Sequence, residues 1–326
     1  MRELHILEND GGQRLDKFLQ KALPGLPPSL MYKSIRTKKI KVNRKRCEPK
    51  QMLVQGDTVQ LFLAESFFEG KAEMDTSELG RIRADLSVVY EDDALLVVHK
   101  APGISVHEDE SGGGNNLIRL IWAYLYQKGE YDPKKEQSFA PALCHRIDRN
   151  TDGLVICAKT AEALRILTEK IRLHQIEKRY LAVVHGVPRE KHARLVAWHS
   201  KDEKAKKVTI YGKTPPPFAK KIETEYEILA KREDLSLLRV TLHTGRTHQI
   251  RAHMAFVGHP LLGDGKYGKN KEDRAMGYPY QALCAYSLTF AFDETTTALD
   301  YLKGKTITLP MEKVGFLSLF PKSPKV

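Results

Sequence analysis

The chain has 326 residues, of which 41% are hydrophobic and 8% aromatic, as in globular proteins long enough for two domains. Its net charge of +12 and pI near 9.3 favour an anionic partner, because Lys and Arg gain affinity when they release phosphate counterions. Residues 1–10 carry no apolar leader segment, and no run of about 18 apolar residues occurs. We therefore expect neither export nor a membrane span.

The cysteines form no C-x-x-C pair and no metal-ligand spacing. We expect reduced thiols in a cytosolic protein. The four positions are Cys47, Cys144, Cys157 and Cys284.

Residues 12–63 form a self-contained pattern. Apolar residues recur at helical spacing over residues 15–23, and Pro24-Gly25 ends that helix. A second helix is expected after Pro27, with Ser29 as its N-cap. A short strand, a turn and a strand over residues 57–63 follow.

The turn region is strongly basic. Seven of the eleven residues from Arg36 to Arg46 are Lys or Arg, and none is acidic. A solvated surface is the common alternative for such a run. Two short helices followed by a basic hairpin, however, resemble the αL RNA-binding module first seen in ribosomal protein S-four. The resemblance predicts RNA contacts from these residues: Lys33, Arg36, Lys38, Lys39, Lys41, Arg44, Lys45 and Arg46.

Beyond residue 63 we expect first a linker and then a large second domain. Residues 64–84 are charged and lack apolar periodicity. A hairpin over 86–99 and a helix over 117–126 follow, and Thr160 caps a further helix. Strands are expected at 153–158, 179–184, 193–198, 206–211, 222–230, 236–243 and 284–290, and a helix from Arg246 to Phe256. This pattern predicts an α+β fold with a large mixed, mostly antiparallel sheet.

The segment Ala142–Leu154 places one carboxylate, Asp148, in a polar loop just before an apolar strand. A His and two Arg residues lie within three positions of it, and nearby cations favour its ionised form. Such a carboxylate is suited to act as a nucleophile or a base. An Asp before a strand is otherwise most often a turn residue with a surface ion pair.

The same segment resembles the motif of the RluA family of RNA pseudouridine synthases, His-Arg-Leu-Asp-x-x-Thr-Ser-Gly-Leu. This chain has Ile147 in place of Leu and Asp152 in place of Ser. Four further blocks match the family in order: Lys100–His107, Lys178–Gly186, Thr244–His253 and Gly258–Gly268. Together with the αL module, the resemblance spans essentially the whole chain.

The resemblance implies isomerisation of uridine to pseudouridine in RNA. It assigns catalysis to Asp148, with Tyr180 against the base and Arg251 as the ion-pair partner of Asp148. Arg146 would fill the gap left by a base flipped out of its stack, with His145 also near the RNA. Leu283 or Ile250 would line a dry pocket. Supporting roles fall to Thr151, Arg246, His248 and Gly245, where Gly245 would let the chain turn close to the sheet.

The reaction needs no cofactor or metal, and we predict none. The histidines at 243, 248, 253 and 259 do not have zinc-ligand spacing, and the motifs of zinc deaminases and protein kinases are absent. Which step Asp148 performs stays open: attack at C1′, attack at C6 or removal of the 2′ proton. Alternatives are an assembly factor with an inactive synthase domain, or a hydrolase that uses Asp148 with His145.

The resemblance further predicts large-subunit ribosomal RNA as the substrate. We expect a cytoplasmic monomer with an αL module over residues 1–72, a linker over 73–84 and a catalytic domain over 85–326.

Overall fold

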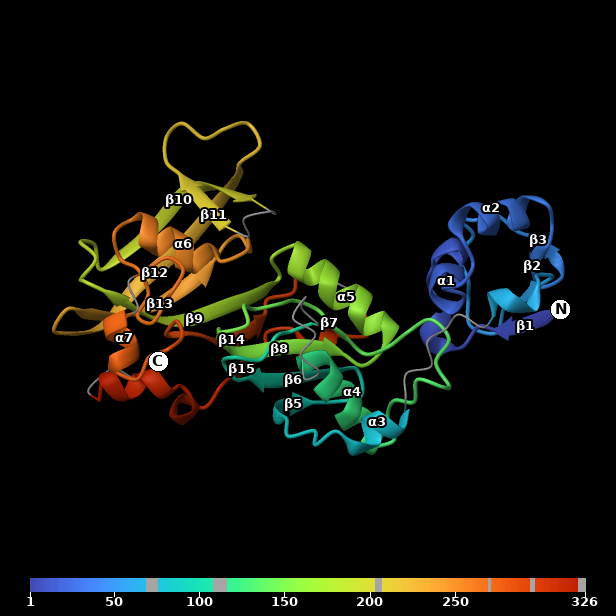
Figure 1. The fold of residues 1–326 in the computed structure, drawn as a ribbon, viewed down its shortest axis with the longest axis horizontal. Coiled ribbons are helices and arrows are strands. Elements are labelled where there is room, and N and C mark those ends of the chain that lie inside the picture. The colour runs from blue at the N-terminus through green and yellow to red at the C-terminus, as the bar shows by residue number, and fades with distance from the viewer. Residues whose placement is uncertain (69–75, 108–115, 203–206, 269–270, 294–296, 322–326) are drawn as a thin grey trace.

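The computed structural model describes residues 1–68, 76–107, 116–202, 207–268, 271–293 and 297–321. Figure 1 shows a small N-terminal module beside a larger body built around one long sheet. None of the helices in these ranges is long and apolar enough to cross a membrane.

The N-terminal module contains the predicted helices α1 (Leu15–Ala22) and α2 (Pro28–Arg36). Its sheet has the order β1-β4-β2-β3, with bounds Arg2–His5, Thr58–Leu61, Ile40–Val42 and Lys45–Arg46. The turn between β2 and β3 has positive φ at Asn43 and Arg44, which suits a two-residue hairpin. Strand β1 and the short 3₁₀ helix η1 (Glu8–Asp10) were not predicted.

Ser29 is not the N-cap of α2, contrary to the prediction. The helix begins at Pro28 with Pro27 as its cap residue, and no side chain caps it. Proline suits the first helical turn because its φ is already helical and its missing N–H would have no partner there.

The predicted linker is partly structured. It contains the 3₁₀ helix η2 (Glu65–Phe67) and helix α3 (Thr76–Arg81), and the expected boundary at residue 72 lies outside the described residues. Helix α3 packs on α4 (Leu117–Gln127), where Leu79 is buried and Glu78 pairs with Arg119. Helix α3 therefore belongs with the larger body, whereas η2 belongs with the N-terminal module, where Phe67 packs on the apolar cluster and Glu65 pairs with Arg2.

The larger body contains an 11-stranded sheet. Its main path runs β11-β10-β12-β13-β9-β14-β8-β6-β5, with β15 beside β14 and β7 beside β8. Among the described strands β14 and β8 pair in parallel and the others antiparallel, which confirms the mixed, mostly antiparallel prediction. The bounds are β5 Ser87–Glu91, β6 Leu95–Lys100, β7 Ala142–Leu143, β8 Asp152–Ala158, β9 Ile176–His185, β10 His192–Asp202, β11 Lys207–Tyr211, β12 Lys220–Arg232, β13 Leu235–Leu242, β14 Leu283–Phe290 and β15 Thr306–Thr308.

Both faces of the sheet centre are buried. Along β8 alternate residues enter two separate apolar clusters, with Leu154 and Ile156 in one and Val155 and Cys157 in the other. Helix α5 (Ala161–Arg172), capped by Thr160 as predicted, covers the first face. Helices α4 and α6 (Gln249–Phe256) cover the second.

The remaining short helices lie in the C-terminal third. They are α7 (Lys271–Ala275) and the 3₁₀ helices η3 (Asp300–Leu302), η4 (Met311–Lys313) and η5 (Gly315–Leu319).

The parallel contact between β14 and β8 brings two backbones very close at Gly153. This residue has a φ of +123°, and a Cβ there would lie 2.4 Å from the backbone N and O of Ala285. Only glycine fits such an approach. It directs the chain from the Asp148 loop into β8.

A polar contact joins the two modules. The fully buried Asp10 carboxylate accepts hydrogen bonds from the Ser138 amide at 3.1 Å, the Ser138 hydroxyl at 2.5 Å and the Gln137 amide group at 3.0 Å. Asn9 accepts from the backbone N–H of Ala161 in the first turn of α5 at 3.1 Å. Charge-assisted bonds to a buried carboxylate are among the stronger hydrogen bonds, so this contact fixes how the modules meet.

Candidate active site

The Asp148 loop is held in place by a buried lysine. Lys100 is fully buried at the end of β6, and its Nζ donates to the carbonyl oxygens of Arg149 at 2.8 Å and Ala101 at 3.0 Å. Burial lowers the pKa of Lys100 to about 8. The Thr151 N–H donates to the Asp148 carbonyl at 3.0 Å and closes the loop as a turn. The carboxylate is therefore presented by a rigid loop.

Arg251 joins two carboxylates. Its Nη1 lies 2.8 Å from Asp148 Oδ2, while Nε and Nη2 lie 2.7 and 2.9 Å from the two oxygens of Asp264. Burial opposes the charge of Arg251, but the two carboxylates outweigh it and raise its pKa. Asp264 is fully buried, whereas the Asp148 side chain is 25% exposed. A bidentate pair with the buried carboxylate thus orients Arg251 toward the accessible one.

His248 completes this cluster from the N-terminus of α6. Its Nδ1 lies 2.8 Å from the Tyr267 hydroxyl, and its Nε2 lies 3.9 Å from Asp148 Oδ2. The helix was expected to begin near Arg246, but it begins at Gln249 because His248 has a φ of 53° and precedes the helix as its cap residue. Both His248 and Arg251 nevertheless lie close to Asp148.

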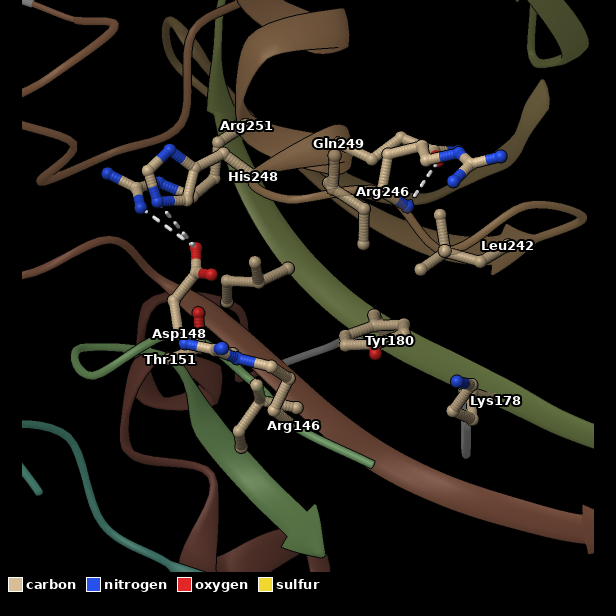
Figure 2. A pocket seen from close by; sticks show the side chains of 14 residues that line it. Arg146, Asp148, Thr151, Lys178, Tyr180, Leu242, Arg246, His248, Gln249 and Arg251 are labelled. Atoms are coloured by element: carbon tan, nitrogen blue, oxygen red, sulfur yellow. Dashed lines mark hydrogen bonds and ion pairs between the residues drawn. The ribbon is translucent and has the colours of Figure 1, made fainter. Parts of the chain in front are cut away.

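The Asp148 carboxylate borders a pocket of about 100 Å³ (Figure 2). Of the predicted residues, it is lined by Arg146, Asp148, Thr151, Tyr180, Gly245, Arg246, His248, Ile250, Arg251 and Leu283. Burial first, and then the nearby Asp148 charge, raise the pKa of Tyr180, so its phenol stays protonated at neutral pH. The pocket therefore combines one partly exposed anion with aromatic and aliphatic walls.

The prediction that Gly245 is needed for the chain to turn close to the sheet is wrong. Its φ is not positive, and a Cβ at this position would meet nothing within 4 Å. The turn is instead fixed by Gln249, which accepts from the Thr244 hydroxyl at 2.8 Å and the Arg246 N–H at 3.0 Å. Gly245 stands at the open edge of the pocket.

The basic residues predicted to bind RNA lie at the surface of the N-terminal module. All are exposed except Lys41, which is half-buried beside the Phe62 ring. His145 lies differently, because its Nε2 accepts from the backbone N–H of Ile156 in β8 at 3.2 Å. Its part in RNA contact stays a prediction.

Several residues in or next to the pocket were not predicted, and one of them, Asp264, contacts Arg251 without lining the pocket. Asp264 had been matched to a family block but given no role. Lys178 lies two residues before Tyr180 in β9 and so faces the same side of the strand, a spacing that could have identified it. Ile147, Leu242 and Gln249 also line the pocket.

Comparison with known proteins identifies this architecture. Residues 94–256 match the model of the RNA pseudouridylate synthase family, and residues 13–59 match that of the S4 domain. The chain belongs to the RNA pseudouridylate synthase family. It is an isomerase with an N-terminal RNA-binding module.

Relatives with assigned names cover most of the chain. "Ribosomal large subunit pseudouridine synthase C" of Buchnera aphidicola is 34% identical over 83% of this chain and 82% of its own length. The protein of the same name from Escherichia coli is 33% identical over 83% of this chain and 81% of its own. A solved structure, "Human RNA Pseudouridylate Synthase Domain Containing 4", covers 74% of this chain and 94% of its own with a TM-score of 0.55 at 22% identity, which shows the shared fold.

Proposed function

We propose that this protein converts uridine to pseudouridine in large-subunit ribosomal RNA, with Asp148 as the catalytic carboxylate. The observation that carries this proposal is the Asp148 carboxylate itself, partly exposed in a pocket and held at 2.8 Å by Arg251. The names of the relatives from Buchnera and Escherichia coli support the choice of RNA.

The proposed reaction breaks the C1′–N1 bond, rotates the detached uracil and joins C5 to C1′; the C5 proton is released to water and N1 takes up a proton in its place. Asp148 supplies the anionic group beside the sugar and the base. Arg251 keeps that carboxylate oriented, because its own position is set by two bonds to Asp264. Tyr180, Leu283 and Ile250 form the walls that hold the detached uracil after the C1′–N1 bond breaks and before the C5–C1′ bond forms.

The target uridine must leave its stack, since C1′ and C5 are unreachable within a helix. Arg146 is exposed at the mouth of the pocket, which supports its role in filling the gap left by the flipped base. The exposed basic hairpin of the N-terminal module supports RNA binding at phosphates, which positions the substrate without reading its bases.

We also propose that the protein acts as a monomer in the cytoplasm. All four cysteines are free thiols, which suits a reducing compartment.

Tritium release from RNA labelled at uridine C5 tests the reaction. A synthase releases the label without shortening the RNA or freeing uracil, whereas a hydrolase would free uracil and an inactive assembly factor would release nothing. Mapping pseudouridine in ribosomal RNA from cells with and without the protein tests the substrate. If every large-subunit pseudouridine persists without the protein, another RNA is the target.

A further inference from the structure

A second, larger depression adjoins the active-site pocket. It measures about 830 Å³ and shares four lining residues with the pocket: Lys178, Leu242, Gly245 and Arg246. Its walls come from the end of α5, the start of β9 and the neighbouring parts of β10, β12 and β13. We call it the flanking groove. The pocket and the flanking groove border each other at these shared residues.

Cations outnumber carboxylates in the flanking groove. Five Lys and Arg residues line it against three Glu residues: Arg172, Lys178, Arg179, Arg194 and Arg246 against Glu177, Glu223 and Glu225. His174 and His243 also line it.

Each of the three carboxylates already has a basic partner. Glu177 lies 3.3 Å from Arg179, and Glu225 lies 2.7 Å from both His192 and His243. Glu223 pairs with Lys221 and Arg194, which lower its pKa to about 2. The three carboxylates are therefore occupied by basic side chains, and Arg172 is itself paired with Glu169 outside the lining. The positive charge that remains for a ligand is that of Lys178 and Arg246.

Two cations at the junction with the pocket have no such partner. Among the residues that the structure describes, no carboxylate lies within ion-pair distance of Lys178 or Arg246. Lys178 is half-buried, and burial lowers its pKa. In Figure 2 it lies along the same strand as Tyr180. A half-buried ammonium without an acidic partner is costly unless an anion joins it, so this junction is suited to a phosphate.

We infer that the flanking groove binds the sugar–phosphate backbone of the nucleotides adjoining the target uridine on one side. The inference rests on the proposed function and specifies the side on which the RNA strand leaves the pocket. A uridine held beside Asp148 remains attached to its neighbours through phosphates, and the first phosphate on this side passes between Lys178 and Arg246. The groove then holds the strand that follows, with Arg172 and Arg194 at its rim.

A series of RNAs of increasing length on either side of one target uridine tests this inference. Extension of the RNA toward the groove should lower KM until the groove is filled. Extension on the other side of the uridine should change KM with a different dependence on length. Arg172 and Arg194 are exposed, with side chains 68% and 54% accessible, so the double variant Arg172→Gln/Arg194→Gln should fold. A matched control is Arg232→Gln/Lys303→Gln, which removes two exposed cations elsewhere on the larger body.

The groove variant should raise KM for the long RNA about tenfold and lessen the gain from extension. Its slope of log affinity against log salt should fall by about 1.4, at roughly 0.7 per lost phosphate contact on a single strand. The control should match wild type in both. An unchanged KM and salt slope in the groove variant would overturn the inference. Binding of the same RNAs, followed by fluorescence anisotropy, keeps the test independent of catalysis, because a failure of the proposed function would abolish tritium release in wild type too.

Discussion

Asp264→Asn should damage both the stability of the protein and its activity. The Asp264 carboxylate is fully buried and accepts four N–H groups, from Arg251 Nε and Nη2 and from the backbone of Lys266 and Tyr267, at 2.7 to 3.2 Å. Burial alone would raise the pKa of Asp264, but Arg251 and the two amides hold it below its usual value. An asparagine keeps one acceptor oxygen and turns an N–H₂ group toward donors.

The expected loss follows from this geometry. Removing one partner of a buried ion pair costs about 3–5 kcal/mol, against a total stability of roughly 5–15 kcal/mol for a typical protein. Arg251 would then keep at most one of the two bonds that orient it toward Asp148, so tritium release should fall at temperatures where the variant is still folded. Urea unfolding followed by circular dichroism measures the first effect, provided that the m value is unchanged.

Asp148→Asn is the matched control. Asp148 is a quarter exposed and makes one 2.8 Å bond to Arg251, so its replacement should cost less than about 2 kcal/mol of stability. If Asp264→Asn unfolds within about 1 kcal/mol of wild type, or if Asp148→Asn costs as much, the reasoning about the buried pair is wrong.

Three further outcomes are expected. Asp148→Asn should abolish tritium release while RNA affinity stays near wild type, and residual turnover within about tenfold of wild type would exclude Asp148 as the catalytic group. Deleting residues 1–72 should leave slow activity on short RNA and should lower stability, because the Asn9 bond to α5 is lost. The deletion should also flatten the salt dependence of RNA affinity, and an unchanged slope would mean that the basic hairpin contacts no phosphate. The free energy of unfolding should fall as pH drops from 6.5 toward 4, because burial lowers the pKa of His253 to about 4 and the unfolded chain takes up the proton first. In urea titrations His253→Gln should flatten this pH dependence, and an equal slope of stability against pH in both proteins would contradict the prediction.

The sequence located the residues of the proposed catalytic group better than the residues that hold them in place. Asp148, Tyr180 and Arg251 could be located because each lies in a distinctive motif, and all three line one pocket. The role of Asp264 in orienting Arg251 depends on a contact made only after α6 and the following loop have folded together. A single sequence does not reveal which of several nearby cations a carboxylate will meet.

The same limit applies to contacts between distant segments and to local backbone geometry. Asp10 meets Ser138 across 128 positions of sequence, and neither residue stands in a motif. The left-handed His248 delays the start of α6, although the apolar and polar pattern from Arg246 onward is helical. Side-chain pattern predicts a helix more reliably than it predicts the residue at which the helix begins.

The close approach at Gly153 sets different mutational constraints on two adjacent codons. Every missense change at position 153 adds at least one carbon atom where the Ala285 backbone already lies, so a saturation library selected for activity should retain glycine there. Position 152 points away from this contact, and its Asp side chain instead lies 2.6 Å from His99 Nε2. Serine, which the RluA motif carries at that position, should survive the same selection. Drift in this lineage can thus act on the residue beside the glycine but not on the glycine itself.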